Sequence, residues 1–267
     1  LLLVCTSDID VTYSNWKEMM SFYVGELSKY SSFKGFLLGD ELAIGRLNNY
    51  TKLLAFFNEE YPELIITTSM FPNYVYDNNP GALTDDTSTY NTEELAYRNY
   101  VKQFGTAAGH FLYDNYSLLK RTAGVTGEVT YSVEEDWYTN LQWVAEEGLT
   151  NGFTTGVVIQ TSEMPLTTNV WGTEKIKYST DNQKDIGFQL YTGMAYGMQE
   201  FGYFSYYQHW TDGENANAMI DAEGKTTGVY TAVKAANEEI AKFAKGEENK
   251  NYAKLEFLYG EYKNIMY

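Results

Sequence analysis

The sequence predicts an α/β protein built on parallel strands, and two observations indicate this class. Short runs of β-branched and aromatic residues alternate with longer segments whose apolar residues recur at helical spacing, which is typical of strand–helix units. The chain has 267 residues, of which 44% are hydrophobic. It can therefore bury a full core as one large domain.

Six such units are expected in chain order. The first strand is the apolar run LLLVC and its neighbours, and each later strand is a similar short apolar run. The expected strands are residues 1–6, 33–39, 64–69, 111–113, 155–160 and 201–207. The expected helices are residues 13–30, 47–61, 92–105, 137–147, 180–196 and 227–244.

Cap and turn residues set several of the boundaries. Residues 73–91 contain Asn-Asn-Pro-Gly and Thr-Asp-Asp-Thr-Ser-Thr, which predict a long loop. Thr92 is a suitable N-cap for the helix that follows it. Gly148 and Gly197 follow the apolar pattern of two later helices and are expected to end them.

Two features favour a barrel over an open nucleotide-binding sheet. No Gly-x-Gly-x-x-Gly and no Gly-Lys-Ser/Thr motif follows any strand. Polar side chains follow the C-terminal ends of several different strands, the face where barrel enzymes place their chemistry. We expect a TIM (β/α)8-type barrel that is incomplete at its N-terminus, with six units visible. Residues 1–246 would form it, and residues 247–267 a linker and the start of a following strand or domain.

Two missing units are expected to precede Leu1 in a longer parent chain. The alternative is a truncated barrel whose open edge is covered by a partner.

Charge and composition restrict the partners. A formal net charge of -17 leaves no Lys/Arg surplus to neutralise phosphates, so neither nucleic acid nor an anionic membrane is expected as a partner. No segment is long and apolar enough for membrane insertion. The chain contains 25 Tyr, 14 Phe and 5 Trp. Amphipathic rings suit sugar recognition, although a tyrosine-rich core explains the same composition.

The sequence resembles a known group of enzymes. The segments FKGFLLGDEL, LIITTSMFP, HFLYDNY, DWYTNLQWVAEEG and GMAYGMQEFGYFSYYQHW are similar to the catalytic barrel of glycoside hydrolases related to the clan A and β-galactosidase type. The likeness is greatest to poorly characterised bacterial members whose fourth strand ends in Asp-Glu-Pro. It covers residues 1–244. It implies a secreted or cell-surface bacterial protein that cleaves glycosidic bonds of oligo- or polysaccharides with a carboxylate pair and no cofactor.

The resemblance also implies site residues. The family's fourth-strand glutamate, the general acid/base, corresponds to Glu41, whereas Leu42 replaces the proline that usually follows it. Because side chains alternate along a strand, Asp40 and Glu41 should point apart while the strand stays regular. We therefore expect Glu41 to be catalytic and Asp40 to bind substrate or hold a neighbour's charge state.

The second carboxylate has two candidates. Glu163 lies near the end of the strand where the family carries its nucleophile, three residues beyond Gln160. Asp114 ends the strand before it and follows an apolar run. Either one could form the pair with Glu41 that glycoside hydrolysis requires.

Neutral and aromatic residues at strand ends are expected to bind the sugar by hydrogen bonds and stacking. They are Tyr113, Asn115, Gln160, Trp171, Tyr206, Tyr207, His209 and Trp210. No second histidine lies at ligand spacing from His209, so no metal is expected. The alternative functions are a non-catalytic carbohydrate-binding barrel in a larger cell-surface protein and a scaffold with no ligand of its own.

Overall fold

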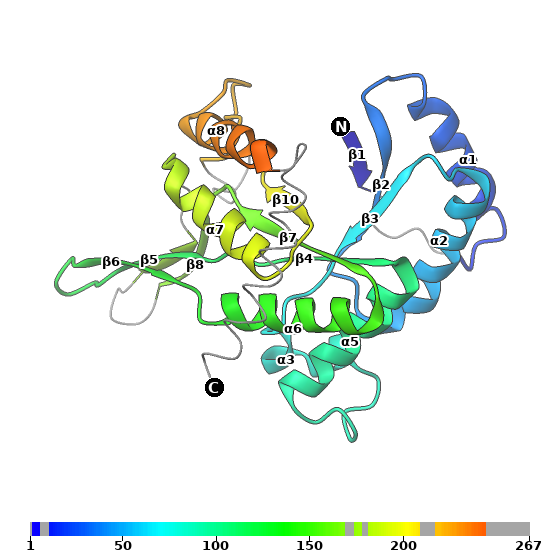
Figure 1. Cartoon of the computed structure of the whole chain (residues 1–267), viewed down its shortest axis with the longest axis horizontal. Coiled ribbons are helices and arrows are strands. Elements are labelled where there is room, and N and C mark those ends of the chain that lie inside the picture. Colours follow the sequence, from blue (N-terminus) through cyan, green and yellow to red (C-terminus); the bar gives the residue numbers. More distant parts are fainter. Residues whose placement is uncertain (1, 6–10, 169–173, 178–180, 209–216, 244–267) are drawn as a thin grey trace. The chain divides into compact units, whose positions relative to one another are not determined.

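The structure is a computed structural model that describes residues 2–5, 11–168, 174–177, 181–208 and 217–243 (Figure 1). The chain forms two compact units. Unit 1 contains Leu1–Asp114 and Glu146–Thr155, and unit 2 contains Asn115–Ala145 and Gly156–Tyr267. Each unit is α/β, as the alternating sequence pattern predicts.

Unit 1 is built on parallel strands. β1 (Leu2–Cys5), β2 (Phe33–Asp40) and β3 (Ile65–Ser69) pair in that order, and both pairings are parallel. β4 (His110–Asp114) follows β3 through a parallel bridge between Met70 and Tyr113. The carboxyl ends of these strands therefore lie at one edge of the sheet.

Helices cover this sheet. α1 (Trp16–Leu27) and α2 (Leu47–Glu60) lie on one side of β2 and β3 (Figure 1), with a 3-10 turn, η1 (Ile44–Arg46), leading into α2. The ring of Phe36 on β2 lies 5.3 Å from that of Phe57 on α2, measured between centroids. Such aromatic pairs stabilise a core beyond the area that they bury.

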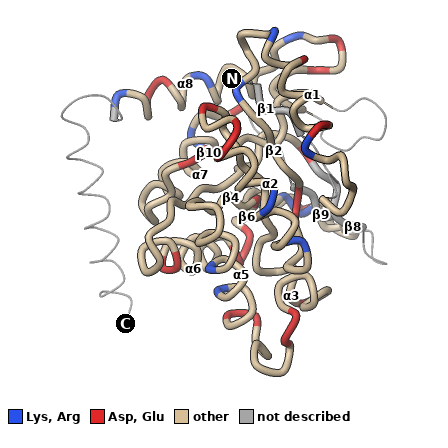
Figure 2. Tube along the Cα trace, turned by 90° about the vertical axis from the view of Figure 1, so that its right-hand side faces the viewer, with Lys and Arg blue, Asp and Glu red and all other residues tan. Residues whose placement is uncertain are grey.

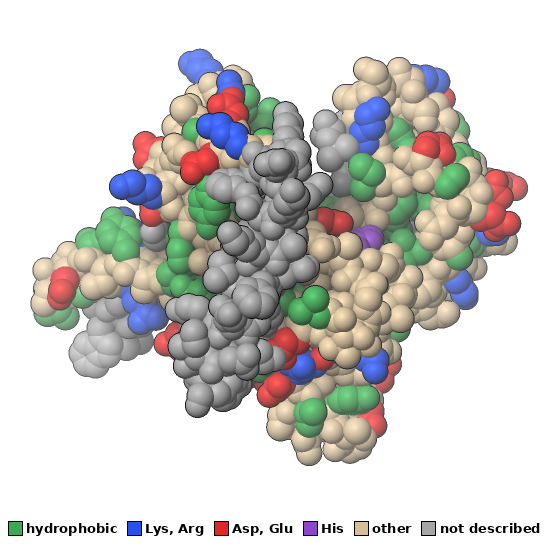
Figure 3. All heavy atoms as spheres, viewed as in Figure 1, with side chains coloured by type: hydrophobic (Ala, Val, Ile, Leu, Met, Phe, Trp, Pro, Cys, Tyr) green, Lys and Arg blue, Asp and Glu red, His purple; other side chains and the backbone are tan. Residues whose placement is uncertain are grey.

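The outer side of α1 remains exposed. Met19, Phe22 and Tyr23 are exposed, whereas Met20 and Val24 point into the core. Figure 3 shows hydrophobic side chains at the surface over α1 and α2.

The loop expected at residues 73–91 is partly helical. It contains two single-turn helices, α3 (Val75–Asn78) and α4 (Pro80–Leu83). Pro80 opens the second of these, where a missing N–H costs no helical hydrogen bond. The expected loop is therefore wrong over these eight positions, because the turn-forming residues build tight helical turns.

The next helix, α5 (Glu93–Ala108), begins as the sequence predicts. The Thr92 side chain accepts a hydrogen bond from the Leu95 amide at 3.3 Å. Gly109 ends the helix in the left-handed conformation, with φ 75°. Threonine is a preferred residue at the N-cap of a helix, and glycine is preferred at a left-handed C-terminal position, so both ends of α5 carry favourable residues.

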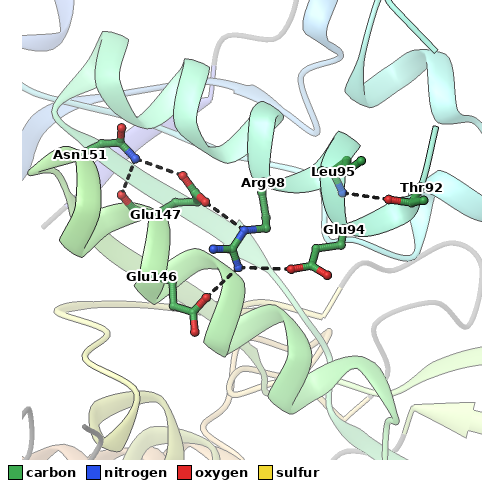
Figure 4. Close-up of polar contacts among 7 residues, drawn as sticks. All are labelled: Thr92, Glu94, Leu95, Arg98, Glu146, Glu147 and Asn151. Carbon is green, nitrogen blue, oxygen red and sulfur yellow. Dashed lines mark hydrogen bonds and ion pairs between the residues drawn. The ribbon is translucent and has the colours of Figure 1, made fainter. Parts of the chain in front are cut away.

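An ion-pair network joins α5 to the C-terminal part of α6 (Asp136–Asn151), the part that belongs to unit 1 (Figure 4). Arg98 donates to Glu146 at 2.7 Å and to Glu147 at 3.0 Å, and Glu94 lies 3.7 Å away. The side chains of Arg98 and Glu94 are partly exposed, whereas those of the two α6 glutamates are mostly enclosed. A guanidinium can bond two carboxylates at once, which fixes the two helices against each other.

Gly148 does not end α6, contrary to expectation. The helix continues through Asn151, and Gly152 provides the left-handed residue with φ 77°. A Cβ at Gly148 would lie 2.5 Å from the Thr155 Cγ2 atom and 3.0 Å from the Phe153 carbonyl oxygen. Close packing, rather than chain termination, therefore explains the glycine.

Unit 2 holds the remaining strands, except that the first two residues of β7 belong to unit 1. β7 (Thr154–Gln160) pairs in parallel with β10 (Glu200–Phe204). The helices α7 (Gln183–Ala195) and α8 (Gly228–Phe243) lie close together in the same unit. These elements agree with the expected strands and helices of this region to within a few residues, although Tyr206 and Tyr207 fall beyond β10.

Unit 2 also contains an unexpected antiparallel sheet. Its order is β6-β5-β9-β8, formed by β5 (Leu118–Thr122), β6 (Val129–Val133), β8 (Met164–Thr168) and β9 (Glu174–Lys177). Four of the five β6 residues are exposed. Pairing with β5, rather than burial, therefore maintains this strand, and Figure 1 shows the β5–β6 hairpin reaching outward from its sheet.

The described strands do not close into the expected barrel. They form small sheets, and β1 pairs only with β2 among the described residues, whereas a closed barrel needs every strand paired on both sides. The α/β class and the parallel pairings are confirmed. The linker expected at residues 247–267 lies outside the described residues.

Charged residues are spread along the described trace. Figure 2 shows Lys and Arg interspersed with Asp and Glu over many elements. Among the described residues, no helix combines the length and apolar character that crossing a bilayer requires.

Candidate active site

Three carboxyl groups of unit 1 form the candidate site, and we call them the carboxylate cluster: Asp40, Glu41 and Asp114. Asp40 is the last residue of β2, and Asp114 is the last residue of β4. Because the strands are parallel, both acids lie at the carboxyl edge of the sheet. The sequence predicts this placement from the apolar runs that precede each acid.

Glu41 leaves the strand in an unusual conformation. Its φ is 51°, in the left-handed region, which residues with a Cβ seldom adopt. Its amide donates to the Ser69 carbonyl oxygen at 2.8 Å, which fixes the end of β2 against β3. Glu41 lies beyond the regular strand, so the alternation of side chains along β2 does not determine the direction of its side chain.

Asp114 is the most enclosed acid of the cluster. Only 5% of its surface is exposed, and the Ser69 hydroxyl donates to its Oδ1 atom at 3.3 Å. Burial, together with the negative charges of Glu41 and Asp40, raises the pKa of Asp114 from 3.8 to about 7. Hydrogen bonds from the Asp114 backbone and from Ser69 act in the opposite direction. At neutral pH this carboxyl group is therefore divided between its protonated and ionised forms.

The two β2 acids are more accessible. The side chains of Asp40 and Glu41 are exposed, yet the surrounding protein still removes part of their hydration. This desolvation raises the pKa of both groups, and the charge of Asp40 adds to the rise at Glu41. The charges of Asp40 and Glu41 also disfavour ionisation of Asp114, so the three carboxyl groups share one electrostatic environment.

Buried tyrosines lie behind the cluster. Tyr97, Tyr100 and Tyr113 are each fully buried. Burial raises the pKa of all three phenols well above the usual value, and the charge of Asp114 adds to the rise in each. Tyr113, expected to bind substrate, has its hydroxyl enclosed with no hydrogen-bond partner in the described part of the chain.

The cluster can carry out acid–base chemistry. One carboxyl group holds a proton to about neutral pH, and a second, exposed carboxyl group interacts with it electrostatically. Two acids whose surroundings separate their proton affinities can serve as proton donor and as carboxylate within one site. Among the described residues, no group of three His, Cys, Asp or Glu side chains is arranged to hold a metal ion.

Glu163, the other candidate for the second carboxylate, lies in unit 2. It is half-buried, and the Asn217 side-chain amide donates to its Oε2 atom at 3.4 Å. The structure brings Asp114 and Glu41 together within unit 1. Glu163 belongs to unit 2, where its observed contact is with Asn217, and its role as the second carboxylate stays a prediction.

Gln160 is engaged in the interior of unit 2. Its side-chain oxygen accepts from the Leu118 amide at 2.9 Å, and its side-chain nitrogen donates to the Leu118 carbonyl oxygen at 3.2 Å. Gln189 in turn bonds both backbone groups of Gln160, at 3.0 and 3.1 Å. This glutamine therefore acts as a buried link between β7 and β5.

Asn115 is also enclosed. Its surface is 0% exposed, and neither polar atom of its side chain has a hydrogen-bond partner among the described residues. Tyr206 and Tyr207 are exposed beyond β10, and the Tyr207 hydroxyl donates to the Ala222 carbonyl oxygen at 3.2 Å. The expected sugar-binding residues Trp171, His209 and Trp210 lie outside the described residues.

Sequence reasoning missed Tyr100. It lies on α5 near Tyr97 and Phe104, at a spacing that indicates core packing, and it does pack there. Its hydroxyl nevertheless donates to the Leu42 carbonyl oxygen at 2.6 Å, directly after Glu41. Periodicity identifies the buried face of a helix, but it does not reveal where a buried hydroxyl finds its partner.

Comparisons with known proteins found weak similarity. No family model and no curated protein matches the sequence. A solved structure from Bacteroides thetaiotaomicron, provisionally described as an alpha-L-fucosidase, is 10% identical over 83% of this chain, with a TM-score of 0.48. The chain spans 59% of the length of that protein. A GH10 xylanase from Thermobacillus composti is 8% identical over 87% of this chain and 74% of its own, with a TM-score of 0.41.

Proposed function

We propose that the chain is a glycoside hydrolase-like protein in which Glu41 and Asp114 form the carboxyl pair that cleaves a glycosidic bond of an oligo- or polysaccharide. The observation that carries this proposal is the grouping of Glu41 and Asp114 at the ends of β2 and β4, in the carboxylate cluster. A buried Asp114 with a pKa of about 7 interacts with an exposed Glu41 held in a left-handed conformation. Such strained and perturbed groups cluster at functional sites.

The pair has distinct roles in this proposal. Asp114 keeps its proton to about neutral pH, so it can donate to the leaving oxygen as a general acid. Glu41, which is exposed, supplies the second carboxylate that glycoside hydrolysis requires. This reverses the roles expected from the resemblance, in which Glu41 is the acid.

The test is hydrolysis of a panel of aryl glycosides by the wild-type protein and by Glu41→Gln and Asp114→Asn. Each substitution keeps the side-chain size and removes the titrating carboxyl group. We expect kcat to fall by roughly 100- to 10,000-fold in both, which is the range for loss of general acid–base catalysis. Glu26→Gln is the matched control, because Glu26 is an exposed glutamate of α1 that pairs with Lys29.

The pH profile provides a second readout. If Asp114 is the acid, activity decreases above about pH 7, where its proton is lost. Full activity in Glu41→Gln, with circular dichroism unchanged, would contradict the proposal. Loss of activity in Glu163→Gln together with full activity in Asp114→Asn would assign the second carboxylate to Glu163 instead.

One observation favours a second candidate, a non-catalytic carbohydrate-binding protein. Asp114 is only 5% exposed, and an acid so enclosed has limited access to a leaving oxygen. Binding on a glycan array without turnover of any aryl glycoside or natural glycan would select this alternative.

A further inference from the structure

The Tyr100 hydroxyl makes hydrogen bonds to the backbone segments that follow β2 and β3. It is fully buried on α5. Its hydroxyl donates to the Leu42 carbonyl oxygen at 2.6 Å and accepts from the Phe71 amide at 3.3 Å. The Sδ atom of Met70 lies 3.5 Å from the same oxygen.

These partners belong to two separate strand ends. Leu42 comes directly after Glu41, beyond β2, and Phe71 comes two residues after Ser69, beyond β3. Ser69 is the residue whose hydroxyl donates to Asp114 and whose carbonyl oxygen accepts from the Glu41 amide. One phenol therefore connects the segment that carries Glu41 to the segment that contacts Asp114.

The conformation of Glu41 needs such support. A residue with a Cβ persists in the left-handed region only where its surroundings hold it there. The Leu42 side chain packs closely over Gly39, since its Cδ2 atom would lie 2.7 Å from a Cβ at that position. The Tyr100 hydroxyl adds a directional bond at the next peptide group.

We propose that Tyr100 is a positioning residue, whose hydroxyl ties the chain after β2 to the chain after β3 and so holds Glu41 in its place beside Asp114. This inference rests on the proposed function for its catalytic consequence, but not for its geometric one. The phenol also lies within electrostatic reach of the cluster. Desolvation raises the pKa of Tyr100, and the charges of Asp114 and Glu41 raise it further.

The test is Tyr100→Phe, which removes one oxygen atom and leaves the ring packed against Phe104 and Phe111. Tyr97→Phe is the matched control, because it removes a buried phenol hydroxyl from the same helix and leaves the two Tyr100 bonds in place. Two readouts are taken for each protein: the carboxyl titrations by 13C NMR, and kcat and KM on the best aryl glycoside.

We expect the Asp114 titration midpoint to fall below about 7 in Tyr100→Phe, because Glu41 moves away and its charge no longer disfavours ionisation. We also expect kcat to fall by about 100-fold with KM unchanged, since a small misplacement of a catalytic group affects the transition state most. Tyr97→Phe should keep the wild-type midpoint and kcat.

Wild-type carboxyl titrations and kcat in a folded Tyr100→Phe would overturn the proposal. The titration readout needs no turnover, so it distinguishes failure of the positioning role from failure of the proposed function. If Tyr100→Phe does not fold, the wild-type protein supplies the measurement. A hydroxyl proton held between Tyr100 and Leu42 should exchange slowly and give its own NMR resonance, and rapid exchange would overturn the inference.

Discussion

Replacing Asp114 with asparagine should make the protein more stable at alkaline pH while removing the proposed acid. The folded state keeps the proton on Asp114 to about pH 7, whereas the unfolded chain releases it near 3.8. Between these values the folded protein binds more protons, so the free energy of unfolding decreases as pH rises through this window. The stabilisation that the protonated Asp114 contributes is fully present below pH 3.8 and is lost as the pH rises past about 7.

The magnitude follows from the size of the shift. One pKa unit corresponds to about 1.4 kcal/mol, so the difference between 3.8 and about 7 amounts to roughly 4 kcal/mol. Because Asp114 is only 5% exposed, solvent screening reduces this value little. Asparagine does not titrate and resembles the protonated acid in shape. We therefore expect Asp114→Asn to match the wild type at pH 4 and to exceed its stability by up to about 4 kcal/mol at pH 8.

Urea unfolding at several pH values between 4 and 8 measures this difference. Asp85→Asn is the control, since it makes the same chemical change at an exposed loop position. A constant stability difference between Asp114→Asn and the wild type across this range would refute the reasoning. A difference that grows with pH, together with loss of activity, would indicate a site that sacrifices stability for function.

Three further predictions concern the framework of unit 1, each measured by urea or thermal unfolding. Arg98→Ala should destabilise the protein by about 2 to 4 kcal/mol, because Glu146 and Glu147 are left enclosed without a cation. Arg98→Lys should recover only part of this stability. A wild-type unfolding midpoint for Arg98→Ala would show that the network contributes nothing to stability. Gly148→Ala should destabilise the protein despite alanine's better helix propensity of about 1 kcal/mol, because the new Cβ meets Thr155; increased stability would contradict the packing explanation. Thr92→Ala should cost about 1 kcal/mol through loss of the N-cap, whereas Thr92→Ser should be nearly neutral.

The sequence predicts the parallel framework because burial and periodicity coincide there. The strand at β2 is an apolar run whose Phe36 and Leu38 are buried, and α5 begins at a threonine cap. The same pattern places Asp40, Glu41 and Asp114 at strand ends, where the structure brings them together. Local signals of this kind suffice when each element buries a continuous apolar face.

The antiparallel sheet has no such signal. Four of the five β6 residues are exposed, including Val129 and Tyr131, so no alternation between buried and exposed positions identifies this strand. Its existence depends on backbone pairing with β5, a relation between segments that a single-residue pattern does not contain. The buried contact of Gln160 has no local signal either, because its partner Leu118 lies 42 residues away in the chain.

Unit 1 is completed by a segment that the ribosome makes late. The part from Glu146 to Thr155 supplies the glutamates that bond Arg98 and the ring of Phe153, whose Cζ atom would lie 2.4 Å from a Cβ at Gly105. A nascent chain that ends at residue 114 therefore contains β1 to β4 but makes neither of these contacts. Cutting the gene after that codon would divide a folding unit rather than release one.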